Sequence, residues 1–446
     1  MRSSLFLRNR PSCRQLSSVV SRCFCTGEKW GSVWSFGDNT NGALGLPAPL
    51  SDAYEPTKVP ELPSNITQVA AGHYHSLAVT SEGEVWAWGR NDEGQLGRCT
   101  DSPRNSWCKP ERVRGLEGVE VRSVSASGVT SSVIGKDGSV WVWGRSKRGQ
   151  LGLGWDVIEA KSPSKVKSLM GHDIDKVSFG WGHALALTTE GKLFGWGYAD
   201  GGRLGEMAAI FHTTPSIYEN IGELSDFERK TPMLEEVNKL VEERIRREDN
   251  MPIIWEPCLV KEVSDVTVSD MSCGLDHSLV LCGDGMLLSG GDNTYGQLAR
   301  KTGEPSLLPV SGISSFSPIS LESGLGHSLA LCHQFPTGNH TSCKTAILSW
   351  GWNIGSQLGR NGNSEIPDIV EGLEGEHIVS VSAGRVHSVA LTREGEVFVW
   401  GSGRNGRLGL GHTMDQGEPA LIESLEGSRV LQAVAGFDHN LLLVAG

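Results

Sequence analysis

A two-part motif that returns seven times constrains the fold of this chain more than any other feature of its sequence. The first part reads aromatic-x-aromatic-Gly, followed after four or five residues by Gly-x-Leu-Gly, as in residues 86–97. The second part reads small-Gly-x-x-His-Ser-Leu-Ala-Leu, and its copies are centred on His75, Thr130, His183, His277, His327, His387 and His439. Self-similarity at a regular period predicts an array of one supersecondary unit rather than a set of unrelated domains.

Each copy of the motif pair predicts a β-hairpin. Residues alternate with period two in both parts, as they do in strands. In five copies an acidic residue followed by glycine, such as Glu82-Gly83, separates the two parts and predicts a two-residue type I′ turn. Glycine accounts for 57 of the 446 residues, well above its usual share of ~7%, as many short strands with tight turns require.

The spacing of the motifs and their order at the two ends predict a closed ring. The motif glycines recur at intervals of 50 to 60 residues, apart from one interval of 94 that contains an insertion. The first aromatic arm, 33–37, has no His-Ser-Leu arm before it, and the last His arm, 439–443, has no aromatic arm after it. Pairing these two arms would hide both sheet edges. We therefore predict an all-β fold, a seven-bladed β-propeller with terminal strand closure, over residues 28–446.

Residues 1–27 differ from the rest of the chain. They contain five arginines and several serines but no Asp or Glu, a composition typical of an organellar transit peptide. Arg22-Cys23-Phe24 is similar to a mitochondrial processing site, so we expect cleavage near 24–28 and a location in the mitochondrial matrix; the alternative is a disordered basic tail. Removing this +5 segment from a chain of −12 leaves −17, which makes direct nucleic-acid binding unlikely.

The long interval contains an insertion at 206–256, for which we predict a helix of about 15 residues. Thr231-Pro232 supplies a cap and a first-turn proline. Apolar residues then recur at helical spacing, at Leu234, Val237, Val241 and Ile245. This helix either docks a partner or packs against the edge of a blade. No stretch approaches the ~20 apolar residues of a membrane-spanning helix, so we expect no membrane span.

Over residues 31–446 these motifs resemble those of the regulator-of-chromosome-condensation repeat family, and with the basic leader the chain is similar to the plant mitochondrial member of that family. The resemblance implies a propeller that works through protein partners. Members of the family serve as guanine-nucleotide exchange factors for small GTPases, as chromatin-bound scaffolds and as the plant UV-B photoreceptor. Mitochondrial members are linked to organelle RNA processing, including intron splicing of complex I transcripts.

The resemblance therefore implies a mitochondrial protein-binding scaffold rather than an enzyme. Such a scaffold would bind proteins of RNA processing, support intron splicing of a complex I subunit mRNA and so support complex I accumulation. The alternative is a guanine-nucleotide exchange factor for an organellar small GTPase, although no exchange residue can be matched to a motif of this chain. Photoreception is rejected. The photoreceptor branch has repeated Trp-Arg pairs at the two variable positions of the second motif, whereas here only Trp181 matches, and it is followed by Gly182 instead of arginine.

The two variable positions of the second motif are the candidate partner-binding site. They lie at blade ends, where loops on a rigid scaffold usually carry binding, and the repeat does not dictate them. Their aromatic and charged residues suit a protein interface. The candidates are His73, Tyr74, Trp181, Asp276, Arg385, Phe437 and Asp438. Ordinary solvated loop residues are the alternative interpretation.

The recurring histidine is interpreted as structural rather than metal-binding. A residue present in nearly every copy answers a need of every blade, such as a hydrogen bond to the backbone, and Thr130 is expected to fill the same polar role. The chain contains no Gly-x-Ser-x-Gly, phosphate-binding loop or His-Glu-x-x-His motif. We therefore expect no catalytic residues, no metal site and no cofactor.

Overall fold

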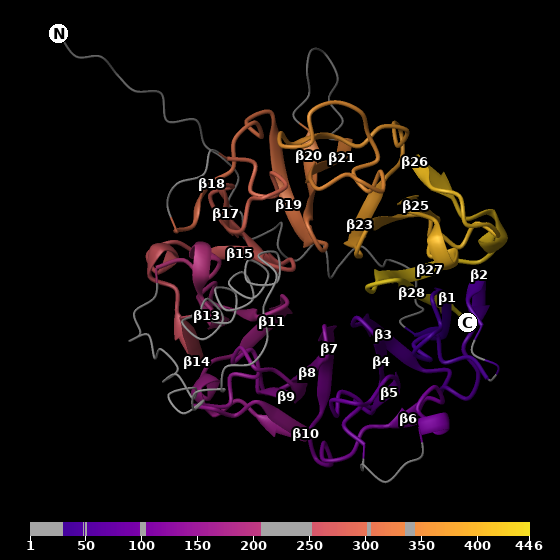
Figure 1. Ribbon diagram of the computed structural model, residues 1–446, viewed down its shortest axis with the longest axis horizontal. Helices are drawn as coiled ribbons and strands as arrows, with labels where there is room; N and C mark the ends of the chain where they lie inside the picture. The colour runs from indigo at the N-terminus through magenta and orange to yellow at the C-terminus, as the bar shows by residue number, and fades with distance from the viewer. Residues whose placement is uncertain are drawn as a thin grey trace, which may run out of the picture.

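The computed structural model describes residues 30–47, 49, 51–98, 104–206, 252–300, 305–334 and 344–446. These residues form β-strands and short 3-10 turns, arranged as sheets that surround a central axis (Figure 1). The prediction of an all-β propeller is confirmed.

The described strands form four-stranded antiparallel units, and the first strand named in each unit is the innermost. The unit that contains the first and last described strands consists of β27 (Val430–Ala435), β28 (His439–Ala445), β1 (Gly31–Gly37) and β2 (Ala53–Lys58). The next unit consists of β3 (Ile66–Ala71), β4 (His75–Thr80), β5 (Val85–Gly89) and β6 (Glu111–Arg112). A single pairing of Gly31 with Ile66 connects these two units into one sheet.

Five separate sheets complete the described strands. They are β7 (Val121–Ser127), β8 (Thr130–Gly135), β9 (Val140–Arg145) and β10 (Glu159–Lys165); β11 (Ile174–Phe179), β12 (His183–Thr188), β13 (Leu193–Tyr198) and β14 (Ile253–Leu259); β15 (Val268–Cys273), β16 (His277–Cys282), β17 (Leu287–Gly291) and β18 (Leu308–Pro309); β19 (Phe316–Ser323), β20 (His327–Gln334), β21 (Lys344–Gly351) and β22 (Asp368–Ile369); and β23 (Ile378–Ala383), β24 (His387–Thr392), β25 (Val397–Gly401) and β26 (Gln416–Leu421). Short 3-10 turns occupy Arg104–Ser106, Lys167–Leu169, Asp200–Gly202, Lys261–Val263, Arg404–Gly406 and Glu423–Leu425.

The two ends of the described chain pair within one sheet. β28 and β1 are antiparallel neighbours along their whole length, from Gly31 opposite Ala445 to Gly37 opposite His439. This is the pairing that the unmatched motif arms predict. A Cβ at Gly31 would overlap the carbonyl group of Val444, so a larger residue there would push β1 away from β28.

The second and third strands of each unit carry the core. β4 and β12 are buried at every position, because adjacent sheets cover both of their faces. The tryptophans near the ends of the third strands are 0% exposed; they are Trp88, Trp143, Trp196, Trp350 and Trp400. Each indole N–H also donates to a carbonyl of the Gly-x-Leu-Gly loop in the preceding four-stranded unit, as Trp88 Nε1 does to Ala43 at 2.8 Å. The tryptophans therefore tie adjacent units together as well as filling the space between them.

The hairpin turns differ from the predicted two-residue type I′ turns. In the first hairpin the N–H of Gly83 donates to the Thr80 carbonyl, and the N–H of Thr80 donates to the Glu84 carbonyl, so the loop has three residues. Gly83 has φ +81°, whereas Glu82 is not among the residues with positive φ. A type I turn followed by a left-handed glycine explains both observations. Of the acid-glycine pair, only the glycine adopts a positive φ.

The motif histidines join neighbouring four-stranded units. Each of six Nε2 atoms lies 2.8 to 3.1 Å from a side-chain oxygen in the next four-stranded unit, and the pairs are His75–Ser131, His183–Ser278, His277–Ser328, His327–Ser388, His387–Asn440 and His439–Ser76. The Ser131 hydroxyl donates to the Gln95 carbonyl, so it accepts from the imidazole N–H. The expected bond from histidine to backbone is wrong, because the partner is a side chain of the next unit.

At one joint between neighbouring units, both the histidine and the serine of this hydrogen bond are replaced. Thr130 replaces the histidine, and Ala184 occupies the serine position of the next sheet. The buried Thr130 hydroxyl has no hydrogen-bond partner among the described residues, so the expectation that it fills the same polar role is wrong. Where histidine is present, a Cβ on the glycine three residues earlier would overlap the ring, as at Gly72; the Thr130 copy has Ser127 there instead. Ser127, Thr130 and Ala184 thus all differ from their usual residues at this one joint.

Two predicted segments fall largely outside the described residues. The transit peptide at 1–27 lies outside them entirely, as does the helix predicted after Thr231. Residues 253–256, which the prediction includes in the insertion, belong to β14. In the part of the chain that the structure describes, no helix has the length and apolar character needed to cross a membrane.

Candidate protein-binding site at the channel mouth

Short loops that join first strands to second strands surround one end of the central channel (Figure 1). We call this end the mouth; it consists of residues 72–74, 128–129, 180–182, 274–276, 324–326, 384–386 and 436–438. These loops carry the variable pairs of the second motif. The first strands and the mouth line a cavity of about 270 Å³.

Backbone hydrogen bonds link neighbouring loops of the mouth. The donor and acceptor pairs are His73 to Gly128, Trp181 to Leu275, Leu275 to Leu325, Leu325 to Gly384, Arg385 to Phe437 and Phe437 to Gly72, at 2.9 to 3.3 Å. The first residue of each variable pair is therefore held in place through its own backbone. Side chains at the mouth are presented by a connected frame rather than by independent loops.

Aromatic side chains gather on one part of the mouth. The His73 ring lies 4.3 Å from the Phe437 ring centroid and stacks on Trp181 at 5.4 Å with an interplanar angle of 18°. Gly128 occupies the position between His73 and Trp181 and has no side chain to separate them. Burial, followed by His439 and Arg385, lowers the pKa of His73 to about 3, so this ring is neutral at physiological pH. Trp181 is 42% exposed and offers an apolar surface to a partner.

Asp438 is held between two arginines. Its carboxylate accepts from Arg385 Nε at 3.0 Å and pairs with Arg407 Nη1 at 3.0 Å. The Arg407 side chain is 1% exposed, so this is a buried charge with its counter-ion. Burial raises the pKa of Asp438, and the two arginines partly offset that effect. The Arg385 guanidinium also lies 4.8 Å from the Phe437 ring centroid.

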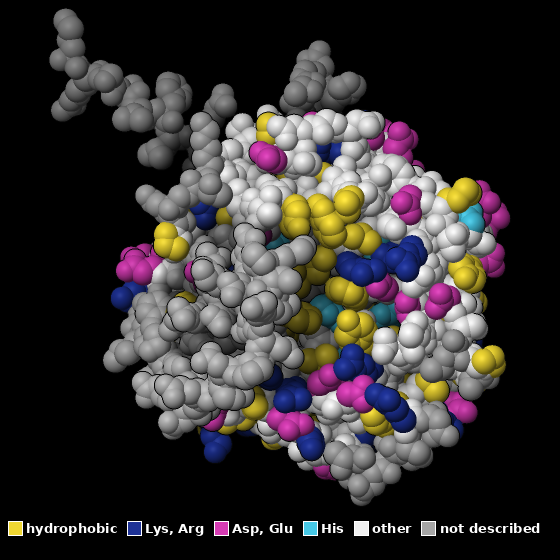
Figure 2. All heavy atoms as spheres, viewed as in Figure 1, with side chains coloured by type: hydrophobic (Ala, Val, Ile, Leu, Met, Phe, Trp, Pro, Cys, Tyr) yellow, Lys and Arg dark blue, Asp and Glu magenta, His cyan; other side chains and the backbone are white. Residues whose placement is uncertain are grey.

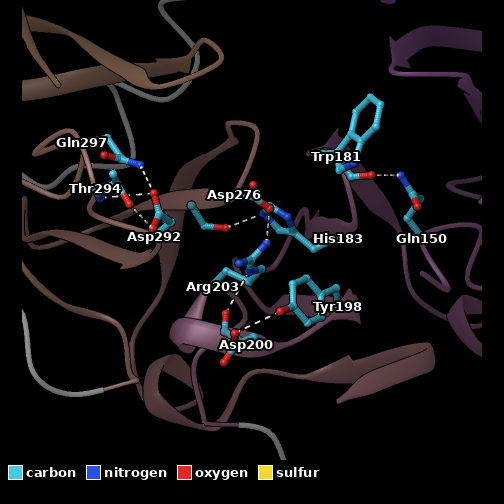
Figure 3. A network of polar contacts seen from close by, with 11 residues as sticks. Gln150, Trp181, His183, Tyr198, Asp200, Arg203, Asp276, Asp292, Thr294 and Gln297 are labelled. Atoms are coloured by element: carbon cyan, nitrogen blue, oxygen red, sulfur yellow. Dashed lines mark hydrogen bonds and ion pairs between the residues drawn. The ribbon is translucent and has the colours of Figure 1, made fainter. Parts of the chain in front are cut away.

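Asp276 has a similar partner at another joint. Its carboxylate pairs with Arg203 Nη1 at 2.5 Å, and the Arg203 side chain is 5% exposed. Figure 3 shows Arg203 reaching toward Asp276, with Tyr198 and Asp200 beside it. The Tyr198 hydroxyl donates to Asp200 at 3.0 Å, and burial is the main reason that the pKa of Tyr198 is raised to about 12. This network connects neighbouring sheets through one oxygen of the Asp276 carboxylate, and the Asp276 side chain is 35% exposed.

The structure brings most of the predicted site residues together. Ring or ion-pair contacts connect His73, Tyr74, Trp181, Arg385, Phe437 and Asp438. Asp276 lies at the mouth but contacts Arg203 instead of this group. The two aspartates are thus engaged within the chain, while the aromatic residues and Arg385 are the better candidates for contact with a partner.

Sequence reasoning missed Arg203 and Arg407, although a signal for them exists. Both occupy the variable position of Gly-x-Leu-Gly, where the other copies have glutamine or alanine. In each case the next copy has aspartate, Asp276 or Asp438, as the second residue of its variable pair. The coincidence of arginine with aspartate in consecutive copies could have predicted these ion pairs.

Further exposed aromatic residues lie on the neighbouring loops. Tyr295 is 47% exposed and stacks on Trp352 at 5.3 Å. Figure 2 shows hydrophobic side chains at the centre of this face, with Lys and Arg side chains and Asp and Glu side chains beside them. Among the described residues no three His, Cys, Asp or Glu side chains are placed to hold a metal ion. The mouth is therefore a mixed apolar and charged surface of the kind that binds proteins.

Comparison with known proteins shows which family and which proteins this chain is similar to. A model of the RCC1-like domain matches residues 32–442. The chain is 29% identical over 399 residues to the Ultraviolet-B receptor UVR8 of Arabidopsis thaliana, covering 88% of this chain and 78% of that protein. It is 28% identical over 425 residues to the human Regulator of chromosome condensation, covering 93% and 90%. A match to human E3 ubiquitin-protein ligase HERC2 spans 82% of this chain but only 8% of that protein.

Solved structures share the fold. Prp20p of Saccharomyces cerevisiae gives a TM-score of 0.71 at 23% identity, covering 98% of this chain and 95% of that chain. Human WBSCR16 gives a TM-score of 0.70 at 21% identity, covering 93% and 98%. At these identities the similarity concerns the architecture alone.

Proposed function

Because this chain belongs to the RCC1-like domain family, we propose that it is a protein-binding scaffold that supports transcript processing in the mitochondrion. In this proposal the scaffold assists intron splicing of a complex I subunit mRNA, and complex I accumulates as a result. Members of the family bind proteins or act as exchange factors for small GTPases. The organelle and the transcript are the finer part of the proposal, and they derive from residues 1–27 and from the resemblance to mitochondrial members.

The arrangement of side chains at the mouth supports the protein-binding part of the proposal. Aromatic side chains and an arginine meet there on a hydrogen-bonded frame, and Trp181 is 42% exposed. Aromatic and arginine residues dominate the binding energy of protein interfaces, and a preorganised surface loses little entropy on binding. Similarity to UVR8 does not extend the proposal to light absorption, because Trp181 is the one tryptophan at the variable positions of the second motif.

Purification of the tagged full chain from mitochondria tests partner binding. The wild-type chain is expected to recover proteins of RNA processing, and their recovery should survive nuclease treatment because the contacts are between proteins. Trp181→Ala should reduce that recovery without changing the amount of folded protein. Recovery of no protein beyond an untagged control would overturn the scaffold.

Transcript analysis tests the role in splicing. Loss of the chain should lower the spliced form of one or a few complex I transcripts while their precursors stay level or rise. Reduced complex I with normal splicing of every intron would instead indicate an assembly factor for the complex. Fusion of residues 1–27 to a fluorescent protein tests the location, because the fusion is expected to enter mitochondria.

Exchange activity on an organellar small GTPase is the alternative, and family membership favours it. The solved structure of Prp20p is described together with its binding to Gsp1p and histones. If the alternative is right, the purified chain accelerates release of a labelled guanine nucleotide from a matrix GTPase. Absence of acceleration across the matrix GTPases would remove it.

A further inference from the structure

We propose that an acidic segment of a partner protein docks where the loop Arg145–Arg148 meets Trp181 at the mouth. This inference rests on the proposed protein-binding function and specifies the chemistry of the partner. The candidate surface consists of Arg145, Lys147, Arg148, Trp181 and the open space at Gly128, and we call it the basic corner.

The basic corner is positively charged, whereas the chain as a whole is negatively charged. Residues 138–155 contain three cations and no Asp or Glu, whereas the whole chain has a net charge of −12. Arg145 and Lys147 are exposed. Within the described ranges neither of them has an ion-pair partner. Cations gathered in this way repel one another, and an anionic ligand relieves that repulsion.

The loop is preorganised and attached to Trp181. The Ser146 hydroxyl accepts from the backbone N–H of Arg148 at 3.2 Å and of Gln150 at 3.1 Å. The Gln150 side-chain amide donates to the Trp181 carbonyl at 2.6 Å (Figure 3). Arg148 runs across Gly182, where a Cβ would lie 2.8 Å from Arg148 Cδ. Because these bonds hold the loop backbone in place beside the tryptophan, a ligand does not have to order that backbone.

An apolar contact lies beside the cations. One face of Trp181 stacks on His73, and the side chain remains 42% exposed. Next to it, a Cβ built on Gly128 would meet no atom within 4 Å, so there is room for a side chain of a partner. A segment that alternates acidic and apolar or aromatic residues would use both the charge and the apolar surface.

A short acidic peptide suits the basic corner better than a nucleic acid does. Acidic residues flank the cations: Glu159 is the strand partner of Arg145, and Asp156 follows the loop. Asp92 and Glu93 pair with Arg90 in the corresponding loop of the preceding unit. An extended phosphate backbone would have to pass these carboxylates, at a cost in repulsion. A short segment that contacts Arg145 and Lys147 passes fewer of these carboxylates than an extended phosphate backbone does.

Binding of a random copolymer, poly(Glu,Tyr), to the full chain tests the proposal by fluorescence anisotropy. We expect binding that weakens as salt rises. Arg145→Glu combined with Lys147→Glu, and separately Trp181→Ala, should each weaken binding about tenfold or more. The control combines Lys58→Glu with Lys167→Glu, two exposed cations outside the mouth, which makes the same change in net charge and should leave binding unaltered.

In the binding assay, any of these results would overturn the proposal: no binding of poly(Glu,Tyr), equal loss in the control variant, or tighter binding of a single-stranded oligouridylate than of the copolymer. The last result would assign the basic corner to nucleic acid. Purification from mitochondria separates this proposal from the proposed function. Unchanged partners with Arg145→Glu and Lys147→Glu would reject the basic corner and leave the scaffold standing. Copolymer binding at the basic corner, without any partner recovered by the wild-type chain, would reject the scaffold alone.

Discussion

Nε2 of His439 lies 3.0 Å from Oγ of Ser76, so β28 is hydrogen-bonded to β4 of the neighbouring four-stranded unit. Both side chains are buried, at 1% and 0% exposure. The Ser76 hydroxyl donates onward to the Ala43 carbonyl at 2.7 Å, which places three parts of the chain in one short network. The joints between sheets are therefore specified by polar contacts as well as by apolar packing.

Removing the imidazole of His439 should destabilise the fold. His439→Ala takes away the buried donor to Ser76 and leaves a cavity, at an expected cost of about 2–4 kcal/mol in the free energy of unfolding. Urea denaturation of His439→Ala, Ser76→Ala and the double variant measures the coupling between them. Thr130→Ala is the matched control, because it removes a buried hydroxyl without a described partner and should cost less. Equal losses in both variants would contradict the assignment.

The missing joint can be completed by three substitutions. Thr130→His alone should destabilise, because the Cβ of Ser127 would occupy the place of the glycine that other copies keep against the ring. Adding Ser127→Gly makes room for the ring, and Ala184→Ser supplies the acceptor. The triple variant is expected to exceed the single variant in stability and to gain about 1 kcal/mol over the wild type. A triple variant no more stable than Thr130→His would show that the three positions are independent.

Acid should weaken the fold at the histidine joints. Burial is the main cause that lowers the pKa to about 3 for His75, His327 and His387 and to about 4 for His277 and His439. The unfolded chain has a histidine pKa of about 6.5, so below that pH it binds more protons than the folded chain, and stability falls toward about pH 4. Each histidine contributes a slope of about 1.4 kcal/mol per pH unit.

Glu322 acts in the opposite direction, as do Asp438 and Glu262, whose pKa values burial also raises. Burial raises the pKa of Glu322 to about 7, so the folded chain takes up this proton first and gains stability as the pH falls from about 7 to 4.5. The histidines outnumber these acids, and the net effect should be a lower urea midpoint at about pH 5 than at about pH 7.5. Glu322→Gln should steepen the loss. An unchanged midpoint would contradict the neutral histidines.

The buried pair Arg407–Asp438 can be exchanged for the residues of another joint. Asp438→Val removes a carboxylate partner from a guanidinium that is 1% exposed, at an expected cost of about 3–5 kcal/mol. Arg407→Gln in the same chain reproduces the combination of Gln357 and Val386, and it should recover most of that loss. Thermal or urea unfolding of both variants checks this prediction. Failure of the double variant to recover would mean that Asp438 stabilises through Arg385 instead.

Two tryptophans should separate stability from binding. Trp400 is 0% exposed and donates its N–H to the Gln357 carbonyl at 2.9 Å, so Trp400→Ala should cost about 3–5 kcal/mol. Trp181→Ala should cost about 1 kcal/mol or less, because the side chain is partly exposed, yet it should lose partners in the mitochondrial purification. Partner recovery that follows the stability of the two variants would contradict a binding role for Trp181.

Much of the fold could be read from the motif copies because their two halves are complementary. The unmatched arms at 33–37 and 439–443 predicted the pairing of β1 with β28. The turn type could not be read, because a glycine after an acid suits both a two-residue and a three-residue loop. The partners of the histidines were missed because hydrophobic periodicity describes one strand at a time. The correlated residues Ser127, Thr130 and Ala184 nevertheless carried that information.

The candidate site was predicted as far as the repeat allows. Residues that the repeat leaves variable came together at the mouth, since equivalent positions of a ring lie at the same end. The aspartates were assigned to a partner because sequence reasoning treated each copy separately. Arg203 and Arg407 belong to the copy before Asp276 and Asp438, and only adjacency between sheets reveals those pairs.

The sheet that unites β27, β28, β1 and β2 has a consequence for biosynthesis. On the ribosome, β1 emerges long before β28, so until β28 is made β1 can pair only with β2, apart from the single pairing of Gly31 with Ile66, and keeps one open edge. Exposed strand edges invite association with other chains, and molecular chaperones exist to shield them. A frameshift or stop codon that removes β28 would leave that edge of β1 permanently open.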